Sequence, residues 1–298
     1  MSIFNKFIII VLPLLPKFFV KLFSGRYVAG NNFKQALNTV KKLNLDGQCA
    51  TLDILGEHTA EKNNSKAITE KYISLVKYID SNNADCNLSI KPSHIGLDID
   101  YSLALTNYIS IVNEAEKFNN FIRLDMESSK ATDLTIRLHN ELRELHRNVG
   151  IVIQAYLKRS EQDIMNLPDN SNIRICKGIY NENERISYKK YEDINENFLR
   201  LLKICFEKNF YVAIATHDIL LINSCIEIIN EYNIKTEMFE FQYLLGVPMD
   251  NAINNFKIKN YKVRSYVPFG KDWYDYSIRR IKENPKIGTY VLKNLFYK

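Results

Sequence analysis

Charged, amide and hydroxyl side chains lie at the ends of short apolar segments along this chain. They are Lys91, Asp125, Gln154, Arg174, Lys177, Thr216, His217, Gln242 and Tyr266. Burying a charged group at the end of an apolar strand is costly unless the group meets a partner or a ligand. Because seven of the eight apolar segments carry such a group, we expect one shared ligand site. The alternative is that these groups only pair with one another at the rim of the fold.

Two adjacent arginines follow the last apolar segment, within the stretch WYDYSIRRIKENP. On a helix, Tyr276, Arg280 and Glu283 fall on nearby turns, while Arg279 points about 100° away from Arg280. Two guanidinium groups can therefore hold one anion from different sides, and a carboxylate or phosphate suits their geometry. A solvated charged helix face is the alternative explanation.

Several kinds of site are absent from the sequence patterns. The five histidines form no HExxH or HxH pair, so no metal site is predicted. No GxGxxG or GxxxxGK[ST] loop is present, which argues against a dinucleotide-binding fold. The net charge of +6 comes without a dense basic run, so nucleic-acid binding is not predicted. The five cysteines form no CxxC pair, which predicts free thiols in a reducing compartment.

Eight apolar, β-rich segments recur along the chain, separated by amphipathic stretches of helical period. They span residues 49–55, 87–93, 121–127, 149–156, 172–179, 211–218, 237–244 and 262–269. Near-continuous hydrophobicity is typical of parallel strands covered by helices. We therefore predict an α/β fold, a (β/α)₈ TIM-type barrel with extra N-terminal helices, whose active site lies at the C-terminal ends of the strands. Residues 26–48 are expected to form one helix before the first strand. An open doubly wound sheet would normally have a Gly-rich first turn.

Residues 1–25 form a separate apolar segment that precedes the barrel, which is predicted to span 26–298. The segment contains FIIIVLPLLPKFFV. It is too short to cross a bilayer, which takes about 20 apolar residues, and no signal-peptidase site follows it. Two interpretations stay open: a short helix packed on the fold, or a segment associated with the membrane surface through its apolar side chains and flanking lysines.

Ten motifs carry a resemblance to a known family. They are RYVAG, TLDILGE, SIKPS, RLDMES, IQAYLKR, RICKGIY, ATHD, FEFQYLLG, RSYVPFG and YSIRRIKEN. With these motifs in family order from about residue 26 to 284, the chain resembles the proline dehydrogenases, which are flavin-dependent barrel enzymes. It departs from the family pattern at Cys176, where valine is usual, at Ile179, where alanine is usual, and at Leu245.

The resemblance implies a role for each matching residue. FAD would lie across the barrel mouth, with Arg174 near the flavin N5 atom and Asp125 organising the polar floor of the site. The implied contacts to the cofactor are Met126, Gln154, Arg174, Cys176, Lys177, Gly178, Thr216, His217 and Gln242. The implied contacts to the substrate are Lys91, Arg279, Arg280, Tyr266, Tyr276, Leu244 and Glu57. Glu57 would pair with Arg279 and close the site.

The activity implied by the resemblance is oxidation of L-proline to 1-pyrroline-5-carboxylate, the first step of proline breakdown. Electrons would pass from FAD to a membrane quinone, which implies a cytoplasmic enzyme that associates with the inner face of the membrane. Two alternatives are a barrel lyase with a Schiff base on Lys91 or Lys177, and a non-catalytic flavin-binding regulatory protein. The presence of Lys91, Asp125, Arg279 and Arg280 argues against lost turnover.

Overall fold

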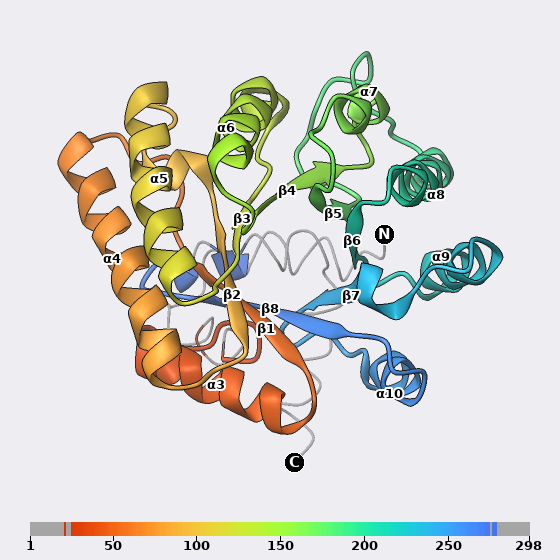
Figure 1. The fold of residues 1–298 in the computed structure, drawn as a ribbon, viewed down its shortest axis with the longest axis horizontal. Coiled ribbons are helices and arrows are strands. Elements are labelled where there is room, and N and C mark those ends of the chain that lie inside the picture. The colour runs from red at the N-terminus through yellow and green to blue at the C-terminus, as the bar shows by residue number, and fades with distance from the viewer. Residues whose placement is uncertain (1–20, 22–24, 275, 279–298) are drawn as a thin grey trace, which may run out of the picture.

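A computed structural model describes residues 21, 25–274 and 276–278 of the chain, and its eight parallel strands close into a barrel (Figure 1). The strands follow one another around the barrel in chain order, and β8 pairs with β1. They are β1 (Cys49–Ile54), β2 (Cys86–Ile90), β3 (Ile122–Leu124), β4 (Val149–Gln154), β5 (Asn172–Cys176), β6 (Tyr211–Ala215), β7 (Phe239–Leu244) and β8 (Val263–Phe269). The predicted barrel is confirmed, with each strand inside its predicted segment except β2, which begins one residue earlier.

Helices alternate with the strands and surround the barrel, as Figure 1 shows. They are α3 (Phe33–Leu45), α4 (Lys62–Ser81), α5 (Tyr101–Lys117), α6 (Thr132–Leu145), α7 (Ser160–Met165), α8 (Tyr191–Glu207), α9 (Ile219–Glu231) and α10 (Asp250–Ile258). None of the helices in the described part of the chain has the length and hydrophobicity needed to cross a membrane. The structural description does not include residues 1–20, so the apolar segment predicted there lies outside it.

The prediction of one helix over residues 26–48 is wrong, because two local features delay the start of α3. Gly30 has a φ of +95°, a left-handed conformation that glycine adopts readily. Asn32 then forms the N-cap, since its side chain accepts a hydrogen bond from the Gln35 backbone N–H. Residues 26–31 form turns and bends instead, and bring Arg26 against the β7–α10 loop, where its Nε donates to the Gly246 carbonyl over 2.8 Å.

The apolar core lies between the strands and the helices. On one side, Leu52, Leu88 and Leu124 of β1–β3 pack in one cluster with Tyr72 of α4 and Tyr108 of α5. A second cluster joins β4–β8 to α8, α9 and α10. Polar side chains alternate with these apolar ones in the strands, and those of Ser89, Arg174 and Gln242 are hydrogen-bonded to one another across strands. The barrel interior is therefore available for a hydrogen-bonded site.

Candidate functional site

A cavity of about 500 Å³ opens at the C-terminal ends of the strands. Its size is within the usual range for small-molecule and cofactor sites, about 300–1,000 Å³. The predicted site residues that line it are Glu57, Lys91, Asp125, Met126, Gln154, Arg174, Cys176, Lys177, Gly178, Thr216, His217, Gln242, Leu244, Tyr266 and Tyr276. Every predicted site residue that the structure describes is therefore brought to one place. The predicted arginines Arg279 and Arg280 lie outside the described residues.

Asp125 is the centre of the polar floor of this cavity. Its Oδ1 accepts hydrogen bonds from Arg174 Nη1 at 2.8 Å and from Ser89 Oγ at 2.5 Å, and its Oδ2 accepts one from the Tyr266 hydroxyl at 2.8 Å. The Arg174 guanidinium also lies 5.2 Å from the centre of the Tyr266 ring. Burial, together with the negative charge of Asp125, raises the pKa of the Tyr266 hydroxyl well above its ordinary value. Tyr266 is therefore a neutral hydrogen-bond donor, held between the Asp125 carboxylate and the Arg174 guanidinium.

A second ion pair lies deeper in the barrel and is connected to the floor through Gln242. The amide oxygen of Gln242 accepts from Arg174 Nε at 2.6 Å, while its Nε2 donates to Glu240 at 2.5 Å. The Glu240 carboxylate also accepts a hydrogen bond from Arg264 Nε at 2.9 Å. Burial alone would raise the pKa of the Glu240 carboxyl, but the Arg264 guanidinium outweighs burial and lowers it to about 2. Hydrogen bonds to Gln242 and to Asp125 therefore fix the orientation of the Arg174 guanidinium from two sides.

Lys91 forms the second cationic element of the floor, and its partner was missed by the sequence analysis. The Lys91 ammonium donates to Asp53 Oδ2 over 2.8 Å, and the two side chains are 13% and 1% exposed. Burial alone would lower the pKa of Lys91, but the carboxylates of Asp53 and Asp125 raise it above its ordinary value. Asp53 lies within the motif TLDILGE, and its position inside an apolar strand was a signal that could have identified it.

The opposite rim of the cavity carries a third ion pair, Lys177 with Asp218, at 2.8 Å. Asp218 also receives hydrogen bonds from Tyr191 and Asn195, and its Oδ1 caps α9. Burial would raise the pKa of the Asp218 carboxyl, but these donors, Lys177 first, lower it to about 2. The ammonium of Lys177 lies 3.8 Å from the Tyr191 ring centre. This arrangement holds a cation at the rim, where an anionic part of a ligand could contact it.

Backbone contacts fix two other predicted residues, and a glycine is needed at a third. Gln154 donates from Nε2 to the Glu127 carbonyl at 2.8 Å, and His217 Nε2 accepts from the Leu244 backbone N–H at 3.0 Å. Gly178 has a φ of +103°, and a Cβ there would collide with the Tyr156 ring. The segment after β5 can therefore lie close to the cavity only with glycine at this position.

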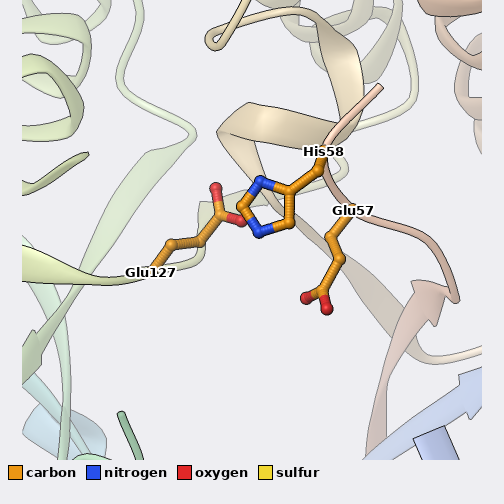
Figure 2. A group of neighbouring side chains, drawn as sticks. All are labelled: Glu57, His58 and Glu127. Atoms are coloured by element: carbon orange, nitrogen blue, oxygen red, sulfur yellow. The ribbon is translucent and has the colours of Figure 1, made fainter. Parts of the chain in front are cut away.

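Three potential metal ligands lie close together, as Figure 2 shows: Glu57, which also lines the cavity, His58 and Glu127. One ligand atom from each lies within 4.8 Å of the others. Asp98 already engages His58 Nδ1 at 2.7 Å, and this hydrogen bond raises the pKa of His58. The Ser93 hydroxyl and backbone N–H already donate to Glu127. These hydrogen bonds account for the positions of His58 and Glu127, and we assign no metal to the cluster.

The donor set of the cavity suits a flavin nucleotide. A flat aromatic ring system with a polar edge needs apolar walls, amide donors or acceptors and a cation near its electron-accepting atoms. The cavity offers walls from Met126 and Leu244, the amide of Gln154 and the cations Arg174 and Lys177. Burial raises the pKa of the Cys176 thiol to about 11, so this cysteine is a neutral wall and not a nucleophile.

Together the fold and the cavity define a class of protein, the (β/α)₈-barrel enzymes with a ligand site at the C-terminal face. Comparison with known proteins narrows the class. The family model described as proline dehydrogenase matches residues 36–291. The chain therefore belongs to the proline dehydrogenase family.

Related proteins agree with this assignment. Proline dehydrogenase 1 of Bacillus subtilis subsp. natto is 34% identical over 279 residues, which cover 93% of this chain and 92% of that protein. Proline dehydrogenase of Deinococcus radiodurans is 33% identical over 278 residues, covering 91% and 89% of the two chains. Among solved structures, proline utilization A from Bdellovibrio bacteriovorus matches with a TM-score of 0.81 and 23% identity. The match covers 88% of this chain but 32% of that longer protein, and it shows a common fold.

Proposed function

We propose that this protein oxidises L-proline to 1-pyrroline-5-carboxylate with FAD as its cofactor. The observation that carries the proposal is the cavity floor, where Asp125 holds Arg174 and Asp53 holds Lys91, inside a barrel of the proline dehydrogenase family. Substrate and cofactor each need a cation in this reaction, and the floor provides one for each.

The substrate carboxylate would contact Lys91, together with the two arginines Arg279 and Arg280. A clamp of this kind converts a loose encounter into a reactive geometry. The aromatic rings of Tyr266 and Tyr276 both line the cavity and would pack against the pyrrolidine ring, which has no polar group at C3 and C4. The clamp and the walls together would fix C5 of proline in one position.

Bound FAD would supply the oxidising power by accepting a hydride from C5 of proline, while the amine loses a proton to become the C=N nitrogen of the product. The cofactor would be held by Met126, Gln154, Cys176, Lys177, Gly178, Thr216, His217 and Gln242. Arg174 would stabilise the negative charge that develops on the cofactor, because it is a cation fixed in advance by Asp125 and Gln242. No side chain of the site needs to act as a nucleophile.

The structure argues against a Schiff-base lyase. A lysine that forms a Schiff base must be a neutral amine in an apolar pocket. Lys91 has the opposite environment, since Asp53 and Asp125 raise its pKa, and Lys177 lies against Asp218.

A steady-state assay tests the proposed activity. The purified protein should reduce a soluble dye with L-proline as electron donor, and the product should give the adduct of a cyclic imine with o-aminobenzaldehyde. D-proline is the matched control, because its carboxylate cannot reach the clamp when C5 occupies the same position. A protein that binds FAD but turns over neither isomer would be the regulatory alternative.

We further propose that residues 26–298 form the catalytic domain, and that residues 1–25 hold the enzyme at the cytoplasmic face of the membrane, where a quinone accepts the electrons. Each large apolar side chain that enters the membrane contributes about 1.5–3 kcal/mol, and each nearby lysine about 1 kcal/mol with anionic lipid. Deleting residues 2–22 should preserve turnover with the soluble dye but weaken binding to anionic liposomes and slow the reduction of quinone in them. If the truncated protein fails to fold, or binds liposomes as well as the full chain, the anchoring proposal is wrong.

A further inference from the structure

Asp53 is the most deeply buried acid at the cavity, and no predicted role accounts for it. Its side chain is 1% exposed, lies one residue before the end of the buried strand β1, and reaches the cavity wall. A carboxylate in such a place is costly unless a fixed cation faces it. That cation is the Lys91 ammonium, 2.8 Å from Asp53 Oδ2.

The backbone fixes the relative positions of these two residues. Asp53 of β1 is paired in register with Pro268 of β8, and the β1–β2 ladder runs through Leu52 and Leu88. Beyond the strands, the Thr59 backbone N–H donates to the Ser93 carbonyl at 3.1 Å. β1 and β2 are thus joined by backbone contacts both before and after Asp53 and Lys91. These contacts hold the Asp53 carboxylate next to the Lys91 ammonium.

Asp53 uses one of the three N–H donors of Lys91 and leaves the other two for a ligand. Within the described part of the chain, Asp53 is the hydrogen-bond partner that the structure gives to the ammonium. Lys91 itself lines the cavity. One acid therefore aims the ammonium at the space in which a ligand carboxylate would lie.

We propose that Asp53 is a positioning residue that holds Lys91 charged and oriented toward the substrate carboxylate. The inference rests on the proposed function for the identity of the ligand, but the state of Lys91 can be measured without turnover.

The other titratable groups around Lys91 cannot replace Asp53. Asp125 and Glu127 follow β3 and favour the charged ammonium from a greater distance, but Asp125 is engaged by Arg174 and Glu127 by Ser93. His94, on the turn after β2, is neutral at physiological pH, since burial lowers its pKa to about 3. The hydroxyl of Tyr266 donates to Asp125. Burial lowers the pKa of Lys91, and the nearby carboxylates raise it. If Asp53 were neutral, less negative charge would oppose the effect of burial, and the ammonium would lose its proton at a lower pH.

The substitution Asp53→Asn tests this role, because it removes the charge and keeps the size and an acceptor oxygen. In the variant, KM for proline should rise between about pH 7 and pH 9, by roughly tenfold for each pH unit above the new pKa of Lys91. The wild-type enzyme should show no such rise over this range, because Asp53 holds Lys91 charged. The value of kcat should change much less than KM, because Asp53 does not touch the reacting C5 atom. Asp53→Glu should restore part of the pH-independence.

Two controls separate the role from a general loss of charge or of structure. Asp98→Asn removes an acid near the mouth that contacts His58 and is not part of the cavity wall, and it should leave the pH profile of KM unchanged. Asp53→Asn combined with Lys91→Arg should have no rise of KM with pH, since a guanidinium does not deprotonate.

A measurement that needs no proline makes failure of this inference distinct from failure of the proposed function. Mass spectrometry after acetylation by acetic anhydride at a series of pH values reports the neutral fraction of Lys91. Modification should begin at a lower pH in Asp53→Asn than in the wild type. Equal pH profiles of acetylation, or a variant KM that follows the wild-type KM from about pH 7 to pH 9, would overturn the role of Asp53. If Asp53→Asn does not fold, the pH profile of KM in the wild type still tests the proposal. A wild-type KM that rises steeply below about pH 9 would show that Lys91 is not held charged.

Discussion

The ion pair between Arg174 and Asp125 allows a quantitative test of the polar floor through Asp125→Asn. The substitution removes the negative charge while it keeps the volume and one acceptor oxygen. Arg174 is 6% exposed, so its guanidinium would stay buried beside the neutral groups Ser89 and Gln242.

The cost follows from the geometry. Breaking a buried ion pair by removing one partner costs about 3–5 kcal/mol of unfolding free energy. The floor faces a cavity, which reduces the desolvation, so we expect the lower end, about 3 kcal/mol. In domains somewhat smaller than this chain, each kcal/mol of lost unfolding free energy lowers Tm by roughly 2–4 °C. We therefore expect the Tm of Asp125→Asn to be about 6–12 °C below that of the wild type.

The double variant Asp125→Asn with Arg174→Met provides the internal control. Replacing both partners of a buried pair by neutral groups is often close to neutral, so the double variant should be more stable than Asp125→Asn alone, by about 2 kcal/mol. Thermal unfolding followed by circular dichroism, with FAD in equal excess in every sample, measures both differences, because a bound cofactor itself raises Tm. A Tm for Asp125→Asn within 2 °C of the wild type, or a double variant less stable than this single variant, would refute the reasoning.

Three further predictions follow from the clamp, the cofactor cation and the deeper ion pair. Arg279→Met and Arg280→Met should each raise KM for proline by roughly 10- to 150-fold, the value of one charged hydrogen bond, and unchanged KM in both would exclude the clamp. Arg174→Met should retain FAD but lower its reduction potential, because developing negative charge loses a fixed cation; spectroelectrochemistry showing an equal or higher potential would contradict this. Glu240→Gln should lower stability by about 3–5 kcal/mol, because it leaves Arg264 buried without a carboxylate. The Glu240 pKa of about 2 is below its unfolded value of about 4.3, so this contribution is complete above roughly pH 5 and disappears as the pH falls toward 2. A stability difference between wild type and Glu240→Gln that stays constant from pH 6 to pH 2.5 would show that the pair does not titrate in this way.

Much of the fold and of the site was predictable because both follow from local patterns. Parallel strands covered by helices are apolar along their whole length, so each strand produced its own segment, and charges at the strand ends indicated the mouth of the barrel. Asp125 and Arg174 were found in this way, and the structure joins them over 2.8 Å.

Other features depend on distances across the barrel, which spacing in the sequence does not contain. Asp53 and Lys91 are 38 residues apart, and their contact needs the register of β1 on β2. Gln242 connects Arg174 to Glu240 only because β5 and β7 lie on either side of β6 in the closed barrel. The start of α3 at Phe33 was missed for a local reason, since the left-handed Gly30 before it interrupts the helical pattern.

Anaerobic titration of the FAD-loaded protein with L-proline is the measurement that tests the central claim most directly. If Lys91, Arg174 and the surrounding floor form a proline-oxidising site, proline should bleach the visible absorbance of the flavin, one equivalent for each flavin, and D-proline should not. A flavin that stays oxidised in the presence of excess L-proline would contradict the account.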